Sequence, residues 1–540
     1  MKKTLISGIC LSLLAGCFDS PSPQAPAAGP VPSAASATQL PPGGQPGGMP
    51  GAVSGAMPMP PSGALPGAAS GAMPAPPSGA MPAGQPGPGG ERQGPPPGGP
   101  GGQQRGGGPG GQPPGPPPGG MAGGPGGHPP GPPPGGFGPG GPGGQGGAGK
   151  VDTGHGALVL AAGQQLKGGV YGSSKADENA IRADGNTRAR LLDVTVEKNA
   201  GAASNNEAAS FYGLNAAVLA LGQARLTLEG GSVRASAEGA TGVFAYDGAT
   251  IYLQDTDIQV TGGNAGGIEV AGGGTLYARN LTVSSADKAA IRSDRGGGKL
   301  LVEGGRYRTQ GRLGAPVIYS TADIQVRDAS LTALDSEAVV IEGFNSVSLV
   351  NSQLSGRMQG TYDPAASDNP RTVMLYQSMS GDAAQGTSHF SMQGGSLVSG
   401  NGDLFYVTNT ASIIDLRQVA VTPAKGAWLL KVAGNDGARG WGQVGANGGT
   451  CTLNLTAQTL TGDIRVDAIS KLTLNLSQGS SLTGAIDADG TQAQSLVVSL
   501  DASSHWTLTQ DSHITALEGD HRGLDLNGHQ LYVAGQPFTP

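Results

Sequence analysis

The sequence predicts an all-β solenoid, a single-stranded parallel β-helix with three short strands per coil, which follows a disordered segment. Two observations lead to this fold class. Residues 18–149 consist almost entirely of Gly, Pro, Ala, Gln, Ser and Met, and hold too few apolar side chains to bury a core. After residue 150, pairs of apolar residues recur at a nearly constant interval, which is the signature of a stacked repeat. The chain therefore divides into a polar tract and one long repetitive domain.

The N-terminus has the features of an export signal. Two lysines precede an apolar run over residues 5–14, which is too short to span a bilayer as a mature helix. The run ends in the sequence LAGC, residues 14–17, which resembles the lipobox of bacterial lipoproteins. The resemblance implies a signal peptide over residues 1–16 and a lipid, with acyl chains such as palmitate, on Cys17. An ordinary cleaved signal is the alternative.

The residues after Cys17 bear on the membrane that receives the anchor. In the lipoprotein family, an Asp directly after the Cys is a retention signal, and this chain has Phe18 there and Asp19 one position later. The resemblance therefore favours the outer membrane, facing the periplasm or the surface. Several acyl chains anchor a protein stably at about 0.8 kcal/mol per buried CH₂ group.

Residues 17–149 are expected to be a disordered linker. The triplet SGA recurs every eight residues from Ser54 to Ser78, and PPGPPPGG occurs twice, from Pro113 and from Pro129. Neither repeat places Gly at every third position, so a collagen triple helix is excluded. The composition cannot offset the entropy lost on folding. We interpret the segment as a spacer.

Residues 150–540 carry the repeat that predicts the β-helix. Inward-facing apolar pairs, each separated by one residue, follow one another at intervals of 25, 25, 24, 24 and 23 residues. Alternation with a period of two is typical of strands. In each coil a second and a third short strand follow. The pairs are Leu226/Leu228, Ile251/Leu253, Leu276/Ala278, Leu300/Val302, Ile324/Val326 and Val347/Leu349.

The pattern continues less regularly to the C-terminus, giving roughly a dozen coils. Insertions are expected over residues 357–387 and 434–449, and Gly pairs between strands are expected at tight corners. Because stacked strands leave open edges at both ends, we expect capping over residues 158–170 and in the C-terminal coils, residues 495–540.

The coils resemble the right-handed, pectin-lyase-like parallel β-helix superfamily, and the last part resembles autotransporter passengers. The resemblance covers about residues 177–540 and rests on the repeat pattern, including LTGDI and LTLNLSQGSSLTGAI near the end. It implies a right-handed helix. Enzymes of the superfamily act on polyuronides with clustered aspartates and a basic residue on one face.

The best match to such a catalytic cluster is weak. Arg292, Asp294 and Arg295 follow a predicted third strand, and Glu342 lies two coils further along. The Gly-Asp-Asp and Arg-x-Lys signatures of the hydrolases are not found. A solvated corner is the simpler interpretation of these charges, so no catalytic residue is assigned and no cofactor is expected.

A pair of outward aromatic residues is the candidate ligand face. Tyr252 and Tyr277 occupy the same position one coil apart, so their rings should stack about 4.8 Å from each other. Aromatic steps bind sugar rings, although a stabilising ladder explains the same pair without a ligand.

Metal binding is not predicted. The histidines of the tail fall eight residues apart, which does not by itself bring imidazoles together, and the sequence from Asp487 to Gly490 departs from a calcium loop two residues later. Cys451, at an apolar position of a strand, is interpreted as a small buried hydrophobe.

Composition limits the partners. The net charge is −7 with 13% charged residues, so no basic surface exists to attract a nucleic acid. The sequence therefore favours a lipid-anchored envelope protein that displays a non-enzymatic binding or adhesion module for a glycan or a surface protein. The alternatives are a polysaccharide lyase or hydrolase acting on polyuronide-like glycans, and a structural envelope spacer.

Overall fold

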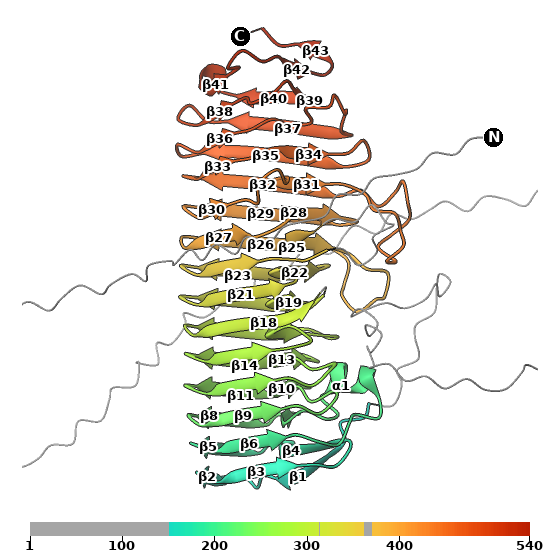
Figure 1. Cartoon of the computed structure of the whole chain (residues 1–540), viewed down its shortest axis with the longest axis vertical. Coiled ribbons are helices and arrows are strands. Elements are labelled where there is room, and N and C mark those ends of the chain that lie inside the picture. The colour runs from blue at the N-terminus through green and yellow to red at the C-terminus, as the bar shows by residue number, and fades with distance from the viewer. Residues whose placement is uncertain (1–150, 313, 361–369, 540) are drawn as a thin grey trace, which may run out of the picture. The chain divides into compact units, whose positions relative to one another are not determined.

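The computed structural model describes residues 151–312, 314–360 and 370–539, and these residues form a parallel β-helix (Figure 1). The chain turns through three sheets in each coil, and successive strands of these three sheets pair in parallel, each with the strand at the same position one coil later. The expected signal peptide and linker, residues 1–149, lie outside the described residues.

Sheet A holds twelve strands in the order in which they occur along the chain. They are β1 (His155–Val159), β4 (Glu178–Ala183), β7 (Val218–Leu221), β10 (Val243–Tyr246), β13 (Ile268–Ala271), β16 (Ile291–Ser293), β19 (Ile318–Ser320), β22 (Val339–Glu342), β25 (Arg371–Tyr376), β28 (Asp403–Thr408), β31 (Leu430–Val432) and β34 (Ile464–Val466).

Sheet B is the longest, with fourteen strands. They are β2 (Gln165–Lys167), β5 (Arg188–Leu192), β8 (Arg225–Glu229), β11 (Thr250–Gln254), β14 (Gly274–Arg279), β17 (Gly298–Glu303), β20 (Asp323–Arg327), β23 (Ser346–Val350), β26 (Thr387–Gln393), β29 (Ala411–Arg417), β32 (Thr450–Thr456), β35 (Lys471–Ser477), β37 (Ser495–Leu500) and β40 (Ala516–Gly519).

Sheet C holds ten strands, and two small sheets follow it near the C-terminus. The strands of sheet C are β3 (Val170–Ser173), β6 (Thr195–Lys198), β9 (Ser232–Ala235), β12 (Asp257–Val260), β15 (Thr282–Ser285), β18 (Arg306–Arg312), β21 (Ser330–Asp335), β24 (Gln353–Gly356), β27 (Ser396–Ser399) and β30 (Ala420–Thr422). The small sheets contain β33 (Thr459–Thr461), β36 (Ser481–Thr483), β38 (His505–Thr507) and β41 (Leu524–Asp525), and β39 (Ser512–Ile514), β42 (Leu531–Val533) and β43 (Gln536–Pro537).

The predicted apolar pairs lie in sheet B and point into the core. Leu226, Ile251, Leu276 and Leu300 are in register on four neighbouring strands, and all four are fully buried. Each such side chain contributes about 1.5–3 kcal/mol by leaving water. The repeat read from the sequence is therefore confirmed as the stacking register of the solenoid.

Corners between sheets B and C are made by residues with positive φ. Asp255, Asn280, Asp328 and Asn351 take this left-handed conformation at φ values of 50° to 54°. Short Asn and Asp side chains tolerate it better than other non-Gly residues do. Glycines also occur at such corners, as the sequence predicts. Gly231 illustrates the need for one, because a Cβ there would lie 2.1 Å from the carbonyl oxygen of Val194.

Two features of the ends and insertions refine the expectations. The expected insertion over residues 357–387 is not irregular throughout, because it contains β25, a full strand of sheet A. The last described residues include a 3₁₀ turn, η1 (His521–Gly523), and an antiparallel pairing of β42 with β43. A reversed strand stops the parallel stacking at this end.

One helix interrupts the pattern of strands in the described part. Helix α1 (Asn206–Tyr212) lies in the connection from β6 to β7, and the Asn205 side chain caps its N-terminus by accepting from the amides of Glu207 and Ala208. In the described ranges, no helix has the length and apolar character that crossing a membrane requires.

Candidate functional site

Tyr252 and Tyr277 stack on the outer face of sheet B, as the sequence predicts. They are paired in register on β11 and β14, their ring centroids are 4.9 Å apart and the ring planes differ by 6°. Each residue remains about 40% exposed. The two rings therefore form a rigid aromatic step on an open sheet surface.

The stacked geometry determines which ring faces a ligand can reach. Because each ring covers one face of the other, only the two outer faces of the pair are free. Thr227 precedes Tyr252 in register and Leu301 follows Tyr277, and both are smaller than Tyr. The free face of Tyr277 is therefore not covered by the shorter Leu301 side chain on the next strand.

A hollow of about 460 Å³ surrounds this aromatic step. Beyond Leu301 it extends over Gln325 and Ser348, which are in register on β20 and β23. An aromatic wall, an apolar floor and nearby amide and hydroxyl groups occur together in many small-ligand sites. This combination is the strongest candidate binding site in the described part of the molecule.

The charged side chains of the hollow balance. Its lining includes Glu229, Arg279, Glu303 and Arg327, two acidic and two basic residues. They occupy the last outward position of their strands, beside the corner to sheet C, and signs alternate along Arg279, Glu303 and Arg327. The hollow therefore has no net formal charge at neutral pH.

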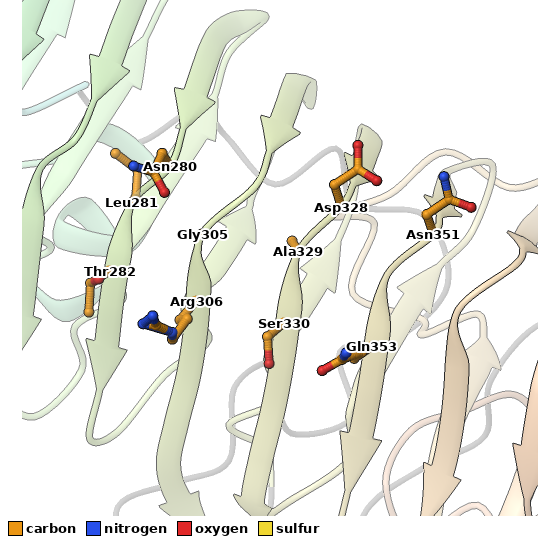
Figure 2. Close-up of a pocket in the computed structure, with 10 residues that line it drawn as sticks. All are labelled: Asn280, Leu281, Thr282, Gly305, Arg306, Asp328, Ala329, Ser330, Asn351 and Gln353. Atoms are coloured by element: carbon orange, nitrogen blue, oxygen red, sulfur yellow. The ribbon is translucent and has the colours of Figure 1, made fainter. Parts of the chain in front are cut away.

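A second hollow, of about 250 Å³, lies at the corner between sheets B and C. Figure 2 shows two rows of side chains across neighbouring coils, with Asn280, Asp328 and Asn351 in one row and Arg306, Ser330 and others in the second. Only polar groups and small side chains face it apart from Leu281. This hollow forms because the corner residues in the left-handed conformation project only short side chains outward.

The expected solvated corner at Arg292, Asp294 and Glu342 is wrong. These side chains lie on the outer side of sheet A, yet they are only 4%, 3% and 2% exposed. The Arg292 guanidinium contacts Asp294, with an Nε–Oδ2 distance of 3.1 Å, and Glu269, with an Nε–Oε1 distance of 3.2 Å. Arg295, in contrast, remains partly exposed. The reason is that other segments cover this side of the sheet.

Three segments cover the outer side of sheet A. Lys288 Nζ donates to the Ser210 hydroxyl of α1 at 2.6 Å. Residues 377–386 follow β25 and contribute Ser378, whose hydroxyl donates to Glu342. Residues 433–449 contribute Trp441, which packs against Tyr376 with ring centroids 5.1 Å apart. The strands of sheet A beneath these segments, such as β16, β22 and β25, are thus buried on both sides, which their short sequences alone do not indicate.

Glu342 is held by hydroxyl groups. Tyr319 and Tyr376 donate to Glu342 Oε2 at 2.7 and 2.9 Å, and Ser378 donates to Oε1. Hydrogen bonds from several donors compensate a buried carboxylate for the loss of water. The guanidinium carbon of Arg292 lies 4.7 Å from the centroid of the Tyr319 ring. Arg292 thereby links its own ion pairs with Glu269 and Asp294 to the hydroxyl groups around Glu342.

Burial shifts the protonation equilibria of this cluster. Burial raises the pKa of Glu269 to about 7, against the opposing effect of Arg292. Burial together with the positive charge of Arg292 lowers the pKa of Lys288 to about 8. Both shifts favour the neutral form of the side chain, because water does not reach this site to solvate a charge.

Arg292, Asp294 and Glu342 are therefore brought close as a sealed network, with the partly exposed Arg295 beside it. A substrate could approach their carboxylates only after α1 or residues 377–386 had moved. The arrangement stabilises the cover over sheet A, and it offers no open site for acid and base chemistry in this conformation.

The remaining candidates have structural surroundings. Cys451 is buried, and burial raises the pKa of its thiol to about 12. His513 stacks on Tyr532 with centroids 4.6 Å apart, and His521 packs edge-on against Phe538. Within the described ranges, no group of three or more His, Cys, Asp or Glu side chains is arranged to hold a metal.

The fold defines the chain as a parallel β-helix protein, and comparisons add no narrower class. No family model, no curated protein and no solved structure matches the chain. Functional inference therefore rests on the site itself.

The aromatic step is evident from the sequence, whereas the rest of the hollow was not predicted. Gln325 and Ser348 line the hollow from one and two coils beyond Leu301. Their outward position could have been predicted from the sequence. Each lies between two inward apolar residues, as Tyr277 does in its own coil.

Proposed function

We propose that this protein is a lipid-anchored envelope protein whose β-helix serves as a non-enzymatic carbohydrate-binding or adhesion module. The observation that carries the proposal is the hollow of about 460 Å³ around the Tyr252–Tyr277 step. The lipid anchor on Cys17 and the outer-membrane location belong to the same proposal, and they rest on the sequence of residues 1–19.

Sugar recognition suits the chemistry of this hollow. The apolar C–H groups of a pyranose pack against aromatic rings, and Tyr277 offers both the exposed edge of its ring and the free face beside Leu301. Gln325 and Ser348 supply an amide and a hydroxyl, which hydrogen-bond sugar hydroxyls as donor and acceptor. Because both rings are already fixed by stacking, binding costs little side-chain entropy.

The lyase or hydrolase alternative would use the cluster of Arg292, Asp294, Arg295 and Glu342. Its carboxylates are engaged by Arg292 and by three hydroxyl groups, and they are buried under the cover. We therefore rank binding above catalysis. The structural spacer alternative requires no ligand at either place.

The proposal is tested by glycan-array binding of the soluble domain, followed by calorimetry with the best glycan. We expect Tyr277→Ala to weaken binding about tenfold, since an aromatic contact is worth roughly 1 kcal/mol or more. Phe344→Ala is the matched control, because Phe344 is 66% exposed and lies outside the hollow.

Two results would contradict the proposal. A blank array for the wild-type domain would favour the spacer. Turnover of a polyuronide, detected by reducing ends or unsaturated products and lost in Asp294→Ala, would establish the enzyme instead.

A further inference from the structure

The hollow on sheet B is elongated along the axis of the solenoid. Its lining comes from six consecutive strands, β8, β11, β14, β17, β20 and β23. Neighbouring strands lie about 4.8 Å apart, so the five intervals between them span roughly 24 Å. This length exceeds that of a single sugar several times.

Each coil contributes the same two outward positions to the hollow. The central row contains Thr227, Tyr252, Tyr277, Leu301, Gln325 and Ser348, and the row beside the corner contains Glu229, Gln254, Arg279, Glu303, Arg327 and Val350. The rise per coil is close to the length of one pyranose unit in an extended chain. A linear polymer lying along the axis would therefore place about one sugar in each of the five intervals between these strands.

The charges of the hollow select against a polyanion. Glu229 and Glu303 equal Arg279 and Arg327 in number, so the lining of the hollow carries no net formal charge. A polyuronide carries one carboxylate per sugar and would meet these acidic side chains without a surplus of positive charge to compensate. An uncharged chain meets no such penalty.

We infer that the ligand of this hollow is a linear, uncharged glycan that lies along the solenoid axis and contacts about five consecutive sugar units. The inference rests on the proposed carbohydrate-binding function and specifies its ligand class. Tyr277 stands near the middle of the hollow, with two lining strands before it and three after it, so it contacts a central unit.

The test is a chain-length series measured by calorimetry on the soluble domain. The probes are β-1,4-linked glucose and β-1,4-linked N-acetylglucosamine oligomers of one to eight units, with β-1,3- and α-1,4-linked glucose oligomers and oligogalacturonates as further arms. For one neutral series, we expect affinity to rise at least about tenfold from the dimer to the pentamer and then to level off.

Variants along the hollow locate the bound chain. Ser348→Ala, at one end, should weaken the pentamer but leave the dimer unchanged, whereas Tyr277→Ala should weaken both. Ser499→Ala is the matched control, because Ser499 projects from the same sheet on β37, outside the hollow. Circular dichroism checks that each variant is folded.

The outcomes separate this inference from the proposed function. Equal affinity for monomer and pentamer, or binding of oligogalacturonates alone, would overturn the linear uncharged ligand while leaving carbohydrate binding intact. Absence of binding to every oligomer and to the glycan array would overturn both.

Discussion

The Asp487 side chain shows how one buried acid links this fold to pH. Its Oδ1 atom accepts from the amide of Val466 at 2.7 Å, whereas Oδ2 is buried and lacks a hydrogen-bond partner among the described residues. Burial raises the pKa of Asp487 from its usual value near 3.8 to about 7. The folded state therefore retains a proton that the unfolded chain releases near pH 4.

We predict that Asp487→Asn stabilises the domain at pH 8 and changes little at pH 4. A raised folded-state pKa gives stability that is present below about pH 4 and is lost as the pH rises towards 7. The amide keeps an acceptor for Val466 and never ionises, so the gain at pH 8 should be about 2 kcal/mol. Urea unfolding at both pH values measures it, and an equal effect at pH 4 would contradict the explanation.

At the scale of elements, Arg295 joins two segments of the cover over sheet A. Its guanidinium lies 4.1 Å from the centroid of the Phe211 ring in α1, and its Nε donates to Asp382 at 2.9 Å. A cation–π contact and a partly exposed ion pair together contribute about 1–2 kcal/mol.

Replacing this link should loosen the cover without disturbing the coils. In Arg295→Ala we expect amide hydrogen exchange over residues 206–212 and 377–386 to accelerate about tenfold, with strands of sheets B and C unchanged. Arg308→Ala on the exposed face of sheet C is the matched control. Unchanged exchange in both segments would show that Arg295 does not hold the cover.

At the scale of the whole molecule, the prediction concerns the anchor. We expect the wild-type protein to incorporate labelled palmitate and to sediment with membranes. Cys17→Ser should lose both properties, because a lipid thioether cannot form on a hydroxyl side chain and the acyl chains supply the membrane affinity. Cys10→Ser, within the apolar run of the signal, is the matched control. Labelling that persists in Cys17→Ser would refute the lipobox interpretation.

Features that repeat from coil to coil could be predicted from the sequence, and features that do not repeat could not. The period of the apolar pairs predicted the register of sheet B, and it placed Tyr252 and Tyr277 in contact. The buried surroundings of Arg292 and Glu342 were not predicted, because the covering segments come from irregular connections. Nothing periodic in the sequence indicates which sheet such a connection folds against.

By itself, the sequence determined that residues from about 150 onward form a parallel β-helix, because strand stacking repeats the same local pattern in every coil. Only the tertiary structure decided which outward side chains face solvent. The Tyr252–Tyr277 step stays open because sheet B is uncovered there, whereas Arg292 and Glu342 are sealed under α1 and residues 377–386. Exposure of an outward residue depends on contacts between segments far apart in the chain, and those contacts have no local signature.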